Sequence, residues 1–111
     1  MLAITVTLGR NYGESAGDAH NAPMSDAEWN DFQTEVSAAI HASVLDGADV
    51  WEERHYAVSD AWNGVPEESV KVTVLGAERF QVQGLAETLK PIGKRYHQDA
   101  VALTYGHSVL V

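Results

Sequence analysis

The residues with the clearest chemical potential are Arg10, Asn11 and Tyr12, which stand between an alternating apolar segment and a predicted helix start. Free backbone N–H groups and the positive end of a helix dipole make such a place receptive to an anion. The guanidinium of Arg10 offers a planar fork suited to phosphate or carboxylate. These three residues are therefore predicted to form a ligand-facing edge. The alternative is that Arg10 pairs with Glu14 or with an acid of the following helix.

A second candidate group lies on a predicted strand, residues 48–58. Glu53 and His55 are two positions apart, which places both on one face of a strand as a ligand pair or an acid–base couple. The alternative is a solvated strand face. Trp51 and His55 join the predicted ligand-binding residues.

Other chemical signatures are missing from the sequence. It has no cysteine, and its five histidines include no pair at the helical spacing of a zinc protease. It contains no glycine-rich phosphate loop and no serine in a nucleophile elbow. We therefore predict no catalytic residue, no metal ligand and no cofactor.

Composition indicates one globular domain over residues 1–111, with 45% apolar and 21% charged residues. Sixteen acids against seven bases give a net charge of −9, which argues against direct nucleic-acid binding and against an anionic membrane. Residues 25–60 carry nine of these acids and one base. That acidic surface either solubilises the chain or mimics nucleic-acid phosphate. The start of the sequence is unlike a signal peptide and no run is long enough to span a bilayer, so a cytoplasmic location is expected.

The first half of the chain is predicted to contain a strand over residues 2–8, a long polar loop over 9–24, and a helix. Ser25 and Glu28 have the spacing of a capping box, and Met24 with Trp29 that of a hydrophobic staple. The apolar stripe of this helix comprises Trp29, Phe32, Val36, Ile40 and Val44.

The second half is predicted to hold two strands, a helix and a last strand. Val70, Val72 and Val74 alternate in the third strand, and the helix carries Leu85, Leu89, Ile92 and Tyr96. Pro91 should kink or divide that helix. The fourth strand covers residues 101–105, and residues 108–111 could add a short one.

This order predicts an α+β, ferredoxin-like βαββαβ sandwich, with two helices on one face of an antiparallel sheet. The other face, expected to receive one valine set and Trp51 or Tyr56, has no cover within the chain. We therefore predict a homodimer.

Short motifs resemble the small bacterial family of unknown function numbered 3574. They are Leu8-Gly9-Arg10-Asn11, Ser25-Asp26-Ala27-Glu28-Trp29 with Phe32, Val50-Trp51, Glu68-Ser69 and Tyr96-His97-Gln98-Asp99-Ala100-Val101. The resemblance implies an α+β domain and brings no established activity.

The favoured hypothesis for function is a non-enzymatic binding protein, a homodimer that captures a small anionic ligand or a protein partner. A phage-type counter-defence protein is its most specific form. One alternative is a small dimeric α+β-barrel enzyme, similar to monooxygenases or isomerases, with Trp51, His55 and Tyr56 around a pocket between sheet and helices. The other is an acidic mimic of nucleic acid.

Overall fold

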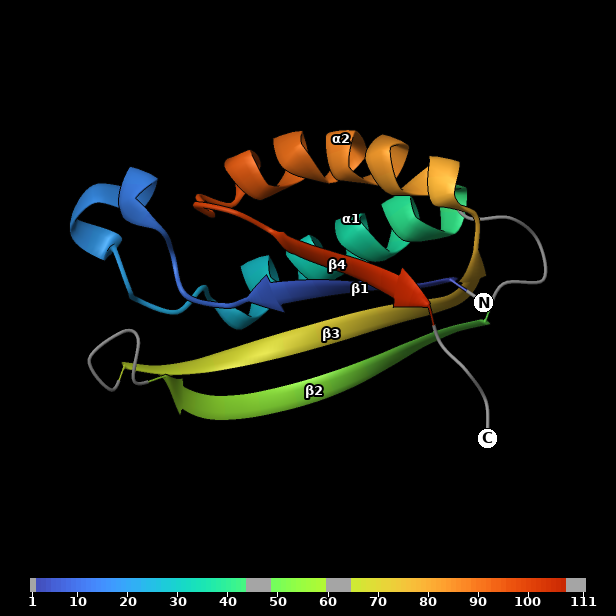
Figure 1. Cartoon of the computed structure of the whole chain (residues 1–111). Coiled ribbons are helices and arrows are strands. Elements are labelled where there is room, and N and C mark those ends of the chain that lie inside the picture. The colour runs from blue at the N-terminus through green and yellow to red at the C-terminus, as the bar shows by residue number, and fades with distance from the viewer. Residues whose placement is uncertain (1, 44–48, 60–64, 108–111) are drawn as a thin grey trace.

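A computed structural model of the chain describes residues 2–43, 49–59 and 65–107. Its elements are β1 (Leu2–Gly9), the short 3-10 helix η1 (Glu14–Ala19), α1 (Asp26–Ser43), β2 (Asp49–Ser59), β3 (Val65–Ala77), α2 (Arg79–Arg95) and β4 (Ala102–His107). The sheet has the order β2-β3-β1-β4, and all neighbouring strands are antiparallel. Both helices cover the same face of this sheet (Figure 1). The predicted α+β, ferredoxin-like sandwich is confirmed.

The core lies between the sheet and the two helices, and alternation along the strands explains its composition. Every second residue of β1 is buried, and the three alternating valines of β3 are buried beside them. The helices contribute apolar side chains at intervals of three or four residues. These side chains include Trp29, Phe32, Val36, Ile40, Leu85 and Leu89. Neither helix of the described chain is long and apolar enough to span a membrane.

The start of α1 follows the predicted capping signal on one side only. The Ser25 hydroxyl accepts the backbone N–H of Glu28 at 3.2 Å, as the capping box requires. The Glu28 carboxylate instead accepts the hydroxyl of Tyr12, so it ties the helix to the preceding loop. Met24 and Trp29 are both buried in the core, and Val44 lies outside the described residues.

Helix α2 continues through Pro91, so of the two effects predicted for this proline, division of the helix is wrong. Pro91 and Glu87, whose carbonyl loses its partner there, are both exposed, so water can satisfy the freed carbonyl. The start of α2 is a capping box between Glu78 and Gln81. Gln81 also donates to the carbonyl of Ser43 at 2.8 Å, which joins the start of α2 to the end of α1.

The sheet face away from the helices carries mostly small and polar side chains where the structure describes it, with the half-buried Leu75 of β3 among them. The expectation that a valine set lies on this face is wrong for β3, since Val70, Val72 and Val74 all face the core. The residues between them are polar or partly exposed, and Thr73 contacts Thr5 of β1 through their hydroxyls at 3.4 Å. The homodimer stays a prediction, and the possible strand over residues 108–111 lies outside the described residues.

Candidate functional site

The connection between β1 and α1 is a folded structure rather than an open loop. Its two arms pair like a short hairpin, in which Met24 N donates to Arg10 O at 3.0 Å and Tyr12 N to Ala22 O at 2.9 Å. Helix η1 forms the tip, beyond the end of β1 (Figure 1). The segment predicted as a loop, residues 9–24, is therefore an ordered hairpin-like connection that contains a short helix.

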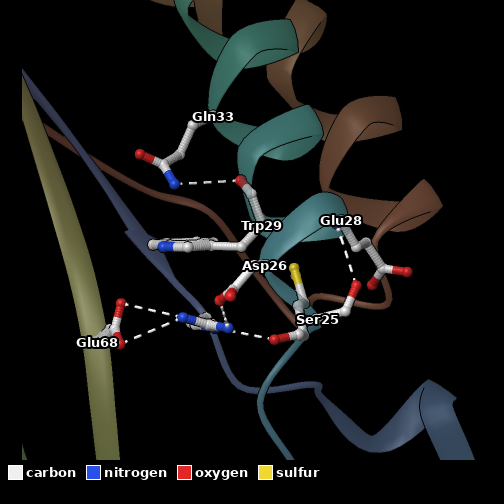
Figure 2. Close-up of polar contacts among 8 residues, drawn as sticks. Ser25, Asp26, Glu28, Trp29, Gln33 and Glu68 are labelled. Atoms are coloured by element: carbon white, nitrogen blue, oxygen red, sulfur yellow. Dashed lines mark hydrogen bonds and ion pairs between the residues drawn. The ribbon is translucent and has the colours of Figure 1, made fainter.

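Arg10 links three elements, and its side chain is only 16% exposed. Figure 2 shows the carboxylates of Asp26 and Glu68 beside the guanidinium group that they contact. Its Nη2 contacts Asp26 Oδ1 at 2.7 Å, its Nη1 contacts Glu68 Oε1 at 3.2 Å, and its Nε donates to Met24 O at 2.9 Å. The hydrogen bond to Asp26 is the largest cause of a raised pKa for Arg10. Pairing with a helix acid, the alternative left open by the sequence, is the arrangement found. Anion binding by Arg10 stays a prediction. It would require the anion to replace Asp26 or Glu68 as the partner of the guanidinium.

Asn11 and Tyr12 are held by different partners. The Asn11 side chain donates to Pro66 O at 2.9 Å, and its backbone N–H donates to Glu67 Oε1 at 3.2 Å. The Tyr12 hydroxyl donates to Glu28, and this hydrogen bond raises the pKa of Tyr12. Both residues line a pocket at the end of the sheet.

The turn before β4 fastens the connection from the other side. Gly13 N donates to His97 O at 2.7 Å, and Glu14 N donates to Asp99 Oδ1 at 2.9 Å. Gln98 Nε2 donates to Asn11 O at 3.1 Å. The connection and the turn lie so close together at position 13 that a glycine is required there, because a Cβ would lie 2.5 Å from Asp99 Oδ1.

These contacts enclose a pocket of about 360 Å³. Its polar lining comes from the connection, the start of β3 and the turn before β4: Asn11, Tyr12, His20, Asn21, Glu67, Gln98 and Asp99. Two carboxylates and no lysine or arginine occur among its described lining residues. One oxygen of each carboxylate accepts a backbone N–H, which fixes its orientation. Such a pocket offers hydrogen bonds to a polar molecule and attracts positive charge.

The structure does not join all the sequence-predicted residues into one site. Trp51 and His55 belong to β2, at the opposite edge of the sheet from β4, and pair in register with Thr73 and Ser69. Their side chains lie outside the described part of the chain. Asn11 and Tyr12 are the predicted residues that line the pocket.

Sequence reasoning missed the acidic side of the pocket. Glu67 follows Pro66 near the start of β3, and Gln98 and Asp99 lie in the turn a few residues before β4. The predicted topology places both positions near the end of β1, because in an antiparallel sheet one strand ends beside the start of its neighbours. The polar residues near those two strand starts, beside the end of β1, were the sequence feature that could have indicated the pocket.

Comparisons with known proteins show the fold. No family model matches the sequence, and no curated protein matches it. Among solved structures, the chain is similar to a phage SAM lyase without ligand, with 16% identity and a TM-score of 0.56 over 95% of this chain and 78% of that chain. The same lyase in complex with S-methyl-5′-thioadenosine gives 16% identity and a TM-score of 0.55, over 95% and 79% of the chains. The de novo designed protein Foldit4 is 11% identical, with a TM-score of 0.56 over 97% of this chain and 98% of that chain.

Proposed function

We propose that the chain binds a compact neutral or cationic small molecule in the pocket between the 9–24 connection and the turn before β4. The observation that carries this proposal is the convergence of Glu67 and Asp99 in a polar pocket whose described lining includes His20 but no lysine or arginine. The anionic ligand expected from Arg10 fits less well, because Arg10 is already paired with Asp26 and Glu68. Two carboxylates would also repel an anion.

An adenosyl sulfonium such as S-adenosylmethionine has the chemistry that this pocket favours. Its sulfonium is positively charged, which suits the carboxylates of Glu67 and Asp99. Its ribose hydroxyls and base nitrogens can exchange hydrogen bonds with amides such as Asn21. The likeness in fold to a phage SAM lyase, a protein captured with S-methyl-5′-thioadenosine, supports this class of ligand.

A ligand panel tests the proposal through thermal stability. S-adenosylmethionine and S-methyl-5′-thioadenosine should each raise the melting temperature of the wild-type protein, because a ligand that binds only the folded state stabilises it. Adenosine monophosphate and small carboxylates should raise it less. Asp99→Asn should shrink the shift with S-adenosylmethionine and leave the shift with the uncharged thioadenosine closer to wild type. Equal shifts for the anions and the sulfonium would contradict the proposal.

Lyase activity on S-adenosylmethionine is a second candidate function. It is favoured by the match in fold over 95% of this chain and by the carboxylates that face the pocket. Incubation with S-adenosylmethionine, followed by chromatography for S-methyl-5′-thioadenosine, distinguishes turnover from binding alone. Product that accumulates with wild type and not with Glu67→Gln supports catalysis. Tight binding without product leaves the non-enzymatic binding protein as the function.

A phage-type counter-defence role is the biological setting proposed for either activity, and the phage origin of the lyase supports it. The acidic mimic of nucleic acid has less support than the binding protein or the lyase. Among the acids of α1, Asp26 pairs with Arg10, Glu28 accepts from Tyr12 and Glu35 pairs with Arg95. These three carboxylates have partners within the chain, although Asp26 remains 91% exposed and Asp31 is exposed as well.

A further inference from the structure

The two edges of the sheet differ in how they are protected. In the described chain, β4 pairs with β1 alone and β2 pairs with β3 alone, so each has one unpaired edge. Exposed edges usually carry charges or proline, which discourage pairing with an uncharged or like-charged edge. β2 contains Asp49, Glu52, Glu53 and Arg54, whereas Ala102–His107 contains no lysine, arginine, acid or proline. The β4 edge is therefore open to a further strand.

A groove runs beside this open edge, between β4 and α2. It has a volume of about 240 Å³ and an apolar floor that includes Leu89, Val101 and Leu103. Lys90 and Lys94 of α2 line the same groove and are exposed. Further along β4, Tyr105 is 57% exposed. A strand added here would cover apolar surface and would meet two positive charges and, at Asp99, one negative charge.

The other edge of the same chain has the matching chemistry. Glu52 pairs in register with Val72, which faces the core, so Glu52 stands on the helix-covered side of the sheet. Glu52 and Asp49 are both exposed on β2. The direction fits as well, because the alternation of strands in the sheet makes β2 antiparallel to β4.

We infer that β4 receives the β2 edge of a second copy of this chain, with Glu52 of the second copy beside Lys90 and Lys94. A copy rotated about an axis along the strands brings its β2 antiparallel to β4 and extends the sheet with its helices on the same side. Each copy then offers one edge to each neighbour, and repetition of this head-to-tail contact forms a ring when the rotation between copies closes. This places the association at the sheet edges rather than on the uncovered face, where the homodimer was predicted.

Charge exchange tests the pairing by sedimentation velocity across a concentration series. Lys94→Glu and Glu52→Lys should each weaken association by about tenfold or more, because like charges would then face each other. The double variant carrying both changes should recover most of the wild-type association. Lys71→Glu and Asp18→Lys change the same charges at other exposed positions and serve as matched controls. Hydrogen exchange in β4 and β2 should slow as the wild-type concentration rises.

Three results would overturn the inference. The first is a wild-type mass of 12.0 kDa at every concentration with no change in exchange at either edge. The second is association that Lys94→Glu changes and Glu52→Lys does not, which would mean that two β4 edges pair with each other. The third is a double variant no better than the single variants. All variants should keep the wild-type circular dichroism spectrum, so a loss of association is not a loss of fold.

Discussion

Arg10 and Asp26 form an ion pair of 2.7 Å that joins the end of β1 to the first residue of α1. The same guanidinium contacts Glu68 of β3, so one side chain links both strands to the helix (Figure 2). The arginine that sequence chemistry nominates for ligand binding is thus a structural bridge beside the pocket.

Arg10→Ala should lower the melting temperature, because Asp26, Glu68 and the Met24 carbonyl all lose a donor. Arg95→Ala is the matched control, since its pair with Glu35 is more exposed, with the Arg95 side chain 54% accessible. Arg10→Ala should be clearly the more damaging of the two in thermal denaturation. An unchanged melting temperature together with lost ligand binding would restore the direct role of Arg10.

The start of α1 should show a graded response to substitution. Ser25→Ala removes the oxygen that accepts the Glu28 N–H and should cost about 0.5–2 kcal/mol of unfolding free energy. Trp29→Ala empties a site where the side chain is 3% exposed and should cost about 3–5 kcal/mol. Urea denaturation measures both values. If Trp29→Ala were no less stable than Ser25→Ala, the assignment of the buried helix face would be wrong.

Two glycines should respond to alanine in opposite directions. At position 13 a Cβ would collide with Asp99, so Gly13→Ala should lower stability by about 1–3 kcal/mol and disturb the pocket. Gly84 lies within α2 and a Cβ there meets nothing within 4 Å. Gly84→Ala should therefore raise stability by about 0.5–1 kcal/mol. Denaturation curves of both variants, with ligand shifts for Gly13→Ala, check this pair of expectations.

Tyr96 should make stability fall in alkaline solution. Burial, aided by the nearby Glu35 carboxylate, raises the pKa of Tyr96 to about 12 from its ordinary value of 10.0. The unfolded chain therefore releases this proton first as the pH rises, and the folded state loses stability between about pH 10 and 12. Tyr96→Phe should reduce this dependence of stability on pH. It should keep the stacking on Phe32, where the ring centroids are 4.8 Å apart.

The sequence predicts the fold well because local signals agree. Alternation in β1 and β3 and the Ser25 cap each specify an element without reference to distant residues. The pocket is harder to predict, because Glu67 and Asp99 lie 32 positions apart in the chain and meet only through the sheet topology. Nor does local sequence show that Glu28 bonds to Tyr12 rather than back to the helix start, since that choice depends on how the 9–24 connection folds.

The central claim is that the acidic pocket binds a compact molecule that is not an anion. Isothermal titration of S-adenosylmethionine into wild type, Glu67→Gln and Asp99→Asn measures this most directly, with Glu78→Gln as a control carboxylate at the start of α2. We predict saturable binding to wild type and Glu78→Gln, and weaker binding to both pocket variants. Binding of equal strength to all four proteins, or no binding to wild type while adenosine monophosphate binds, would contradict the claim.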